Sequence, residues 1–541
     1  MIIPILQEGL ASGDSDTREG VCIGLCEMMN SAGRILEEFL EKCVPIVRTA
    51  LVDSSSDVRI AAAQAFDILH KNMGSKAIDD VIPALLGGIK TDKEGYALEG
   101  LKEIMTIRSN VVFPVLIPTL LTKPITQLNA QALGSLIAVA GSALNNRLDT
   151  IIPTLVDEIE DGNANKEDLV SALDAIMISI EESGVYRVIG ILTELINEGS
   201  LVKKSIACKS LTTFFSSTEE SFEEFIPDTL TLMAGLFSDN SAELVQESWN
   251  CFNAIVQRVR KEDLDRYVLP VRNGIRHAEV NLGFGEDIPA FLLPKALSPI
   301  LSIMLQGLIG GSTECKEAAA YGLGDIICRT PETLLKPYVT QITGPLIRVI
   351  GDRVSPGVKA AILSTIGQLL TKVPTLLKPF LPQLQRTFVK CLSDVTGTSA
   401  MRSKTAQCLS SLIPLQTRLD PLVLELIQGI KSADESIEPA MWESIYGLLK
   451  CVDRGSSKSI NEASQTTLIQ LIMEKLLKSG DNGRISRTGA AKCFAMLCNS
   501  IPLDRSRELL LYDLISIFTN ALLGSCCRLP ILMDGVEFME C

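Results

Sequence analysis

Apolar residues recur along the chain at the spacing of helices that bury one face. Between residues 358 and 370 the apolar positions are Val358, Ala361, Ile362, Ile366, Leu369 and Leu370, and Thr365 completes the stripe. Apolar positions at i, i+3, i+4, i+7 and i+8 predict a helix with one buried face and one exposed face. We predict many such Ala-rich helices, each preceded by a polar turn and a shorter apolar helix.

Prolines accompany the shorter helices. They stand at Pro4, Pro45, Pro83, Pro118, Pro153, Pro227, Pro270, Pro299, Pro345, Pro382 and Pro421. In the first turn of a helix the missing N–H of proline costs nothing, so we expect each of these helices to begin near its proline. Most intervals are about 35 to 46 residues, and the double interval after Pro153 contains VIGILTELINEG, a similar helix without proline.

A period of roughly 40 residues with two helices per unit is typical of HEAT repeats. We therefore predict an all-α fold, an α-α superhelix of about 13 two-helix repeats. A single helix pair cannot bury its own apolar face, so neighbouring pairs must stack. Asp57-Val58-Arg59 has the form of the start of a second HEAT helix. We expect Asp57 to cap this helix and Arg59 to lie on the exposed side of its first turn.

Two segments depart from the repeat pattern. The string NLGFGEDIPAFLLP opens the first, at 281–296, where Gly283 and Gly285 permit positive φ and favour an inserted surface loop. The pattern is lost again near the end of the sequence. We predict HEAT repeats over 1–280, 297–450 and 451–522 and an irregular tail at 523–541. Both ends have the appearance of a cut inside a longer solenoid.

Charge and composition narrow the class of partner. The formal net charge is −15, and an acidic balance of this size argues against broad binding to nucleic acid, because neutralising phosphates needs clustered Lys and Arg. We therefore expect no sequence-specific binding to nucleic acid. A local basic patch on the acidic whole stays open. No apolar run is long enough to cross a membrane and no signal peptide is indicated, so a soluble, cytoplasmic protein is expected.

Few residues suggest chemistry. The two histidines, His70 and His277, stand in different repeats, and the 15 cysteines show no disulfide framework. Cys22 and Cys26 have the spacing of a metal-binding pair, but no second pair with ligand spacing follows, so both are interpreted as core residues. Most cysteines, such as Cys408 and Cys493, fall in apolar helical patterns and are interpreted as buried free thiols. The fragments GLGD at Gly322 and LGGIKT at Leu86 resemble nucleotide-binding motifs only in part and are interpreted as helix ends. We expect no enzyme, metal site or cofactor.

Two sets of basic residues remain. The run from Arg258 to Arg276 is interrupted by acidic residues and is interpreted as a solvated helix-turn face. The second set consists of Arg348, Arg353, Lys359, Lys378 and Arg386, with Phe380 and Phe388 nearby. Turns between paired helices share one edge of a solenoid, so these charges could converge there. Charge spacing alone still favours an ordinary solvated edge.

Several longer strings are more specific than generic HEAT patterning. They are SDTREGVCIGLCEMM, EEFLEKCVPIVRTALVDSSSDVRIAAAQAFDILH, ITGPLIRVIGDR, VKAAIL and LKPFLPQLQRTF. With these strings the chain resembles the general-control-nonderepressible family of very large HEAT-repeat translational activators. The resemblance extends from Met1 to about Asn499 and is to a C-terminal portion that includes the region binding RWD domains.

The resemblance implies a function. Members associate with stalled or colliding ribosomes and help a starvation-responsive kinase to detect uncharged tRNA, after which the kinase phosphorylates the α subunit of translation initiation factor 2. Their C-terminal repeats bind the RWD domain of the kinase. The resemblance places the partner-binding surface within 297–450, centred on Arg348, with Arg353, Lys359, Phe380 and Arg386 as neighbours. Ribosome contact is expected mainly through an elongation-factor-like region that this sequence does not contain.

Other classes stay open from the residues alone. A nuclear-transport receptor of the karyopherin type would also be acidic and HEAT-built, but it usually carries long acidic inner loops that are not evident in this sequence. A phosphatase scaffold is a further alternative, although its repeats are more uniform than these. Binding to an RWD domain, to Ran-GTP or to a phosphatase catalytic subunit would distinguish the three.

Overall fold

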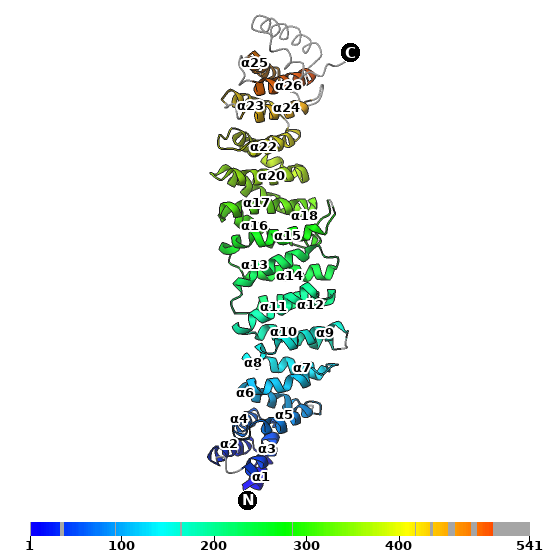
Figure 1. Cartoon of the computed structure of the whole chain (residues 1–541), viewed down its shortest axis with the longest axis vertical. Coiled ribbons are helices and arrows are strands. Elements are labelled where there is room, and N and C mark those ends of the chain that lie inside the picture. Colours follow the sequence, from blue (N-terminus) through cyan, green and yellow to red (C-terminus); the bar gives the residue numbers. More distant parts are fainter. Residues whose placement is uncertain are drawn as a thin grey trace. The chain divides into compact units, whose positions relative to one another are not determined.

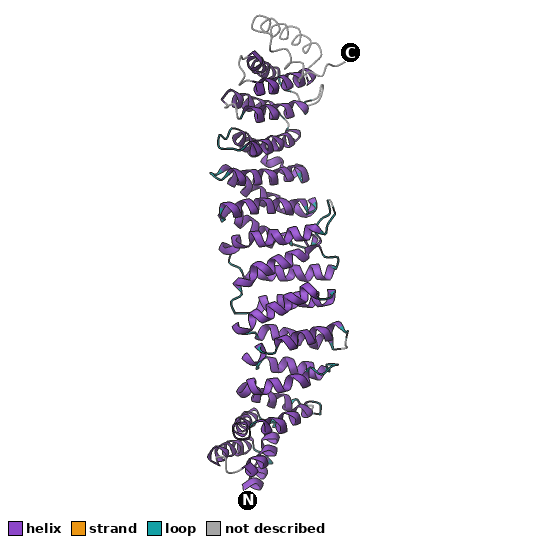
Figure 2. Cartoon of the chain, in the orientation of Figure 1, coloured by secondary structure: helices purple, strands orange, loops and turns teal. Residues whose placement is uncertain are grey.

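The computed structural model describes residues 2–32, 37–91, 94–162, 165–283, 285–416, 418–432, 437–452, 460–477 and 484–500. Within these ranges every regular element is a helix and there is no strand, so the predicted all-α fold is confirmed (Figure 2). The chain forms two compact units, Met1–Arg258 and Val259–Cys541. In each unit, antiparallel helix pairs follow one another in chain order (Figure 1). The predicted tail at 523–541 lies outside the described residues.

The first unit is built from α-helices with short 3₁₀ segments before or after some of them. Its elements are α1 (Ile2–Leu10), α2 (Ser15–Ala32), α3 (Glu37–Ala50), α4 (Ser56–Met73), α5 (Ser75–Ile89), α6 (Tyr96–Leu120), α7 (Gln127–Ile137), α8 (Ser142–Asn145), α9 (Leu148–Glu160), α10 (Lys166–Ser179), α11 (Glu182–Glu198), α12 (Leu201–Ser217), η2 (Glu223–Phe225), α13 (Ile226–Gly235), η3 (Leu236–Ser238) and α14 (Ala242–Arg258). Backbone angles at Arg108 are not helical, so α6 joins the last helix of one repeat to the first helix of the next.

The second unit continues the same arrangement. Its elements are η4 (Lys261–Tyr267), α15 (Val268–Val280), η5 (Pro289–Leu292), α16 (Leu297–Gly310), α17 (Thr313–Cys328), α18 (Glu332–Leu335), η6 (Lys336–Tyr338), α19 (Val339–Gly351), α20 (Pro356–Lys372), η7 (Pro374–Phe380), α21 (Leu381–Leu392), α22 (Ser399–Leu412), η8 (Ile413–Leu415), α23 (Asp420–Ser432), α24 (Glu438–Lys450), α25 (Glu462–Leu477) and α26 (Arg484–Ser500). The second helices of successive pairs, α17, α20, α22 and α24, pack against one another.

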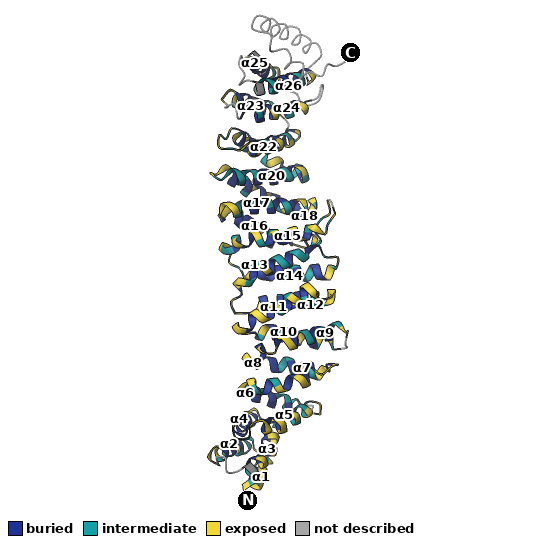
Figure 3. Ribbon diagram, viewed as in Figure 1, coloured by how far each residue is buried: buried dark blue, intermediate teal, exposed yellow. Residues whose placement is uncertain are grey.

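Buried residues lie where neighbouring helices face each other, and exposed residues lie on the outer surfaces (Figure 3). The predicted stripe of α20 is buried along its whole length, and Thr365 is fully buried with it. Each large aliphatic side chain buried in this way contributes about 1.5–3 kcal/mol to folding. The core is therefore a continuous layer between helices, as stacked repeats require.

Polar side chains in this core donate to carbonyls of the second helix of the preceding pair. Thr365 Oγ1 lies 2.6 Å from Ala320 O, and Cys408 Sγ lies 3.1 Å from Leu363 O. Burial raises the pKa of Cys408 to about 12, so the thiol stays protonated and can donate. The interpretation of the helical cysteines as buried free thiols is confirmed for Cys408 and Cys493.

The predicted helix starts are wrong for several prolines. Pro227 and Pro382 do lie in the first turn of their helices. Pro45, Pro83 and Pro345, in contrast, stand inside helices that begin one or two turns earlier. Pro45 and Pro83 are exposed, so the carbonyl that each proline leaves unpaired one turn before it can be hydrated. A short helix on an outer surface therefore accepts an internal proline.

The expected roles of Asp57 and Arg59 are also wrong. Ser55 is the N-cap of α4, and no side chain caps the helix. Arg59 is buried, and its Nη1 donates to Asp53 O at 2.7 Å and to Ser54 O at 3.1 Å. The arginine satisfies carbonyls of the turn before its own helix, because these have no partner in the helix ladder.

The inserted segment is only partly a surface loop. Gly285 has φ of 82°, as a glycine-dependent turn requires. Ile288 and Phe291, however, are buried, and Ile288 N donates to Arg329 O. The glycine motif at Gly322 and Gly324 is likewise not a helix end, since both glycines lie within α17.

Candidate partner-binding surface

The predicted site falls on α19, α20 and α21. α19 and α21 are first helices of consecutive pairs and contact each other. Leu346 on α19 and Phe388 on α21 occupy equivalent buried positions. The opposite side of each helix is open to solvent, and its exposed residues include Gln341, Gly344 and Arg348 on α19 and Gln383, Arg386 and Lys390 on α21.

Three of the predicted residues present free positive charge. Arg348 and Arg386 lie on these matching solvent-facing stripes, and Arg353 lies in the turn between α19 and α20. All three are exposed, and within the described part of the chain none of them forms an ion pair. Unpaired guanidinium groups can form bidentate hydrogen bonds with carboxylates of a partner.

Lys359 is occupied within the fold. Its Nζ lies 2.6 Å from Asp394 Oδ2, and both side chains are largely shielded from solvent. The hydrogen bond from Lys359, followed by that from Thr396, lowers the pKa of Asp394 to about 2. The pair joins the first turn of α20 to the turn that follows α21. Lys359 is therefore used within the fold, and its charge is not free for a partner.

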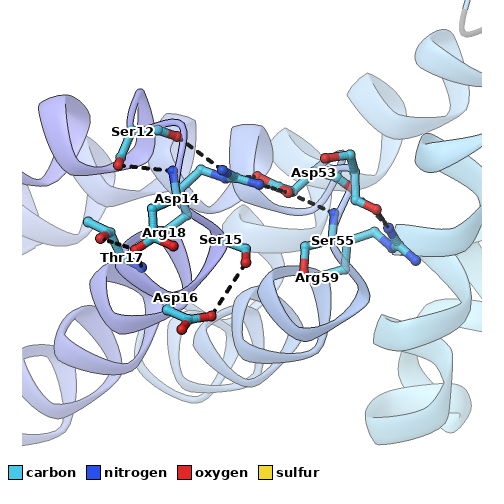
Figure 4. Close-up of polar contacts among 10 residues, drawn as sticks. Ser12, Asp14, Ser15, Asp16, Thr17, Arg18, Asp53, Ser55 and Arg59 are labelled. Carbon is cyan, nitrogen blue, oxygen red and sulfur yellow. Dashed lines mark hydrogen bonds and ion pairs between the residues drawn. The ribbon is translucent and has the colours of Figure 1, made fainter.

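The same arrangement occurs in the first unit (Figure 4). Arg18 of α2 makes two hydrogen bonds with Asp53, of 2.7 and 2.9 Å. Burial acts to raise the pKa of Asp53, but the hydrogen bonds from Arg18 and from Ser55 N–H outweigh it, and the pKa is lowered. In both units, the aspartate in a helix–helix turn binds a cation from the preceding repeat.

The turn between α19 and α20 lacks this contact. Asp352 stands in this turn as Asp394 stands in the next one, and Lys316 on α17 corresponds to Lys359 on α20. In the described residues no ion pair links Asp352 to Lys316 or to any other cation. Asp352 and Arg353 are both exposed. The charges of Asp352 and Arg353, in the turn that follows the helix of Arg348, are therefore available to a partner.

The two aromatic residues of this region differ. Phe380 ends η7 immediately before α21 and is half-buried, so part of its ring can contact a partner. Phe388 is fully buried in the core. Lys390, which sequence reasoning did not include, shares the exposed stripe of Arg386. Its spacing of four residues from Arg386 on an amphipathic helix could have indicated this.

The interpretation of the other basic run as a solvated face is confirmed for Arg260 and Arg266. Both arginines are mostly exposed and pair with Asp263, at 2.9 and 3.1 Å. Arg272 instead lies 3.3 Å from Asp325 and stacks over the ring of Tyr321.

The described residues contain neither a candidate metal cluster nor a candidate membrane-spanning helix. No three His, Cys, Asp or Glu side chains gather there in a way that could hold a metal ion. None of the described helices is both long and apolar enough to cross a membrane.

Stacked helix pairs with a period of roughly 40 residues and paired charges in the turns define a HEAT-repeat scaffold. The model of the family described as "Stalled ribosome sensor GCN1-like, HEAT repeats" matches residues 112–295. The chain is 38% identical over 517 residues to the eIF-2-alpha kinase activator GCN1 of Saccharomyces cerevisiae, covering 94% of this chain and 19% of that protein. By sequence, the chain belongs to this GCN1-like family.

Relatives from animals show the same extent of similarity. The chain is 36% identical over 503 residues to the stalled ribosome sensor GCN1 of Mus musculus, covering 92% of this chain and 18% of that protein. The chain thus spans about a fifth of the length of the curated relatives it matches. Among solved structures, yeast importin-beta (Kap95p) is 14% identical, with 99% of this chain and 71% of that chain covered, at a TM-score of 0.39. This value is too low to distinguish one helical solenoid from another.

Proposed function

We propose that the chain is a non-catalytic scaffold that binds the RWD domain of a stress-responsive protein kinase. Bound on stalled ribosomes, it promotes activation of the kinase, which then phosphorylates the α subunit of translation initiation factor 2. The relatives are named eIF-2-alpha kinase activator and stalled ribosome sensor, which supports the pathway. This function is exercised in the cytoplasm, and other RWD proteins are candidates for the same surface.

The observation that carries the proposal is the state of the three arginines. Arg348, Arg353 and Arg386 project from adjoining repeats and have no ion pair in the described structure. Most other arginines of this unit whose side chains are described, such as Arg272, Arg329 and Arg402, are bound to acidic groups or carbonyls of the fold. Arginine is enriched among the residues that contribute most of the binding free energy at protein interfaces, and it can form bidentate hydrogen bonds with carboxylates.

A titration with a matched control tests the proposal. The chain and its Arg348→Ala variant are titrated with the purified RWD domain of the kinase by isothermal calorimetry. Arg48→Ala serves as the control, because Arg48 follows Pro45 as Arg348 follows Pro345 and is also exposed in the last turn of its helix. We expect micromolar or tighter binding that Arg348→Ala weakens at least tenfold and Arg48→Ala leaves unchanged.

The outcomes separate function from site. If the triple variant Arg348→Ala, Arg353→Ala, Arg386→Ala still binds the RWD domain, the RWD-binding function is supported but the contact lies in another part of the chain. Absence of binding by the wild-type chain would contradict the proposed function itself. In that case Ran-GTP and a phosphatase catalytic subunit are the next ligands to titrate.

A further inference from the structure

A groove in the second unit lies on the second helices of the pairs, whereas Arg348 and Arg386 lie on first helices. It has a volume of about 900 Å³ and runs over α17, α20 and α22. The inserted segment forms one wall, with Gly285 in the lining. The groove lies on other helices than Arg348 and Arg386, so the proposed RWD contact does not use it.

Arg329 fixes the inserted segment against the groove. Its Nη1 donates to Gly283 O and to Glu286 O, both at 3.0 Å, and its Nε lies 3.2 Å from Glu279. Lys372 on α20 approaches Asp287 of the same segment at 3.7 Å. Through these contacts the insertion, which breaks the repeat pattern in sequence, becomes a defined wall at one end of the groove.

The same polar contact recurs between successive second helices beneath the groove. Thr365 donates to Ala320 O, and the equivalent Cys408 donates to Leu363 O one helix further on. The interval that separates Thr365 from Cys408 also separates Ser364 from Gln407, Asp325 from Gln368, and Gln368 from Ser411. These five polar residues all line the groove. Polar side chains therefore stand at matching positions on three consecutive helices.

The side-chain amides of the groove are not used by the fold. In the described structure Gln368 and Gln407 make no side-chain hydrogen bond, and Gln368 Oε1 is shielded from solvent without a partner. Gln368 Oε1 fits over Gly324, where a Cβ would lie only 2.2 Å away. The exposed Gln407 amide offers both a donor and an acceptor, the pair of groups that a peptide main chain requires, and Gln368 adds the donor of its Nε2.

The charge balance of the groove and the side chains exposed on its helices argue against two other ligands, a nucleic acid and an amphipathic helix. The lining contains three acidic residues, Glu279, Asp325 and Glu332, and three basic residues, Arg329, Lys372 and Lys404. This balance does not attract a nucleic acid, which needs an excess of cations. Among the described residues of α17, α20 and α22 no large apolar side chain is exposed, so the groove presents no row of large apolar side chains against which an amphipathic helix could pack.

We propose that this groove binds an extended peptide segment of a partner protein through its main chain, with Gln368 and Gln407 hydrogen-bonding to backbone amides. Neighbouring packed helices are about 8–10 Å apart and an extended chain advances about 3.3 Å per residue, so roughly three peptide residues span each helix. A segment of about seven residues crosses all three helices. Hydrogen bonds from uncharged side chains to the peptide backbone do not depend on the peptide's side chains, so peptides of varied sequence can bind.

Selection from a phage-displayed library of random 12-residue peptides tests the proposal. The selected peptides are synthesised and titrated against the wild-type chain, Gln368→Ala and Gln407→Ala. Gln428→Ala is the matched control, because Gln428 is also exposed, is also followed four residues later by a serine that bonds to its carbonyl, and lies outside the groove. We expect each groove variant to bind about tenfold more weakly and the control to bind as the wild type does.

Two further readouts separate main-chain binding from other modes. N-methylation of single peptide amides should abolish binding at alternate positions, while alanine substitution of peptide side chains should have little effect. Cys328 lines the groove and is exposed, so a bound peptide should slow its alkylation by iodoacetamide, measured by mass spectrometry of the Cys328 fragment. The RWD titration should be unaffected by Gln407→Ala.

Other results would overturn the inference. These are failure to select any peptide, selection of peptides that bind as helices, and binding that is unchanged in both groove variants. Gln407 is exposed, so its substitution does not threaten folding. A negative result with Gln407→Ala therefore counts against the groove and leaves the proposed RWD function intact.

Discussion

Lys359 Nζ lies 2.6 Å from Asp394 Oδ2, although these two residues belong to different repeats. Thirty-five positions of sequence separate them, as they separate Arg18 from Asp53 in the first unit. Because each pair links one repeat to the next, these contacts act on stacking between repeats as well as on the stability of a single helix pair. Thr396 also donates to Asp394, so the carboxylate is well satisfied.

Replacing Lys359 by methionine should lower stability by about 1 kcal/mol, since the chain loses a partly buried ion pair but keeps most of its packing. Trp442 is buried in the second unit, and a Trp249→Phe background makes it the single tryptophan. Urea unfolding followed by its fluorescence then measures the second unit. Lys390→Met, at an exposed lysine that forms no ion pair with any described residue, should have no effect. Equal stability of both variants would show that the ion pair contributes nothing.

Acid should remove the contribution of this pair. The pKa of Asp394 is about 2 in the folded chain, below its ordinary value of 3.8. A lowered pKa means that the stabilisation is complete above about pH 4 and is lost as the pH falls towards 2. The difference in unfolding midpoint between the wild type and Asp394→Asn should therefore be constant from pH 5 to 7 and should shrink below pH 4. A difference that grows on acidification would contradict the assignment.

Sequence patterning predicted the helix pairs and their buried stripes because amphipathic periodicity is local. The stripe from Val358 to Leu370 follows directly from spacing, and burial confirms it. The helix starts at Pro45 and Pro83 were wrong because helix propensity and solvent access outweigh the cost of an internal proline on an outer surface. A sequence does not show which carbonyls can be hydrated.

The candidate site was only partly predictable, because charge pairing depends on contacts between repeats. The exposure of Arg348, Arg353 and Arg386 agrees with the pattern of their helices and turn. That Lys359 is bound to Asp394 while Asp352 is not bound to Lys316 depends on how adjacent turns approach one another. The groove depends on the same long-range geometry, since Gln368 and Gln407 line one groove only when α20 and α22 pack together.

Arg59 should be important for the turn before α4. Replacing it by alanine would leave the carbonyls of Asp53 and Ser54 without their donor, at a cost of about 1–3 kcal/mol. Arg48→Ala, at an exposed arginine of the same unit, should change stability by less than about 0.5 kcal/mol. Both are measured by urea unfolding in a Trp442→Phe background, in which Trp249 reports on the first unit. If the two variants unfold alike, the carbonyl contacts of Arg59 do not stabilise the turn.

Gly100 and Gly190 should respond in opposite directions to alanine. A Cβ at Gly100 on α6 would lie 2.1 Å from Leu51 O, a backbone atom that cannot move aside cheaply, whereas a Cβ at Gly190 on α11 would meet nothing within 4 Å. Gly190→Ala should therefore stabilise the first unit by about 0.5–1 kcal/mol through helix propensity. Gly100→Ala should destabilise it by about 1–3 kcal/mol, because the helix must shift away from the preceding repeat. The same Trp249 fluorescence measures both variants. Stabilisation by Gly100→Ala would mean that α6 does not pack as closely against Leu51 as the structure shows.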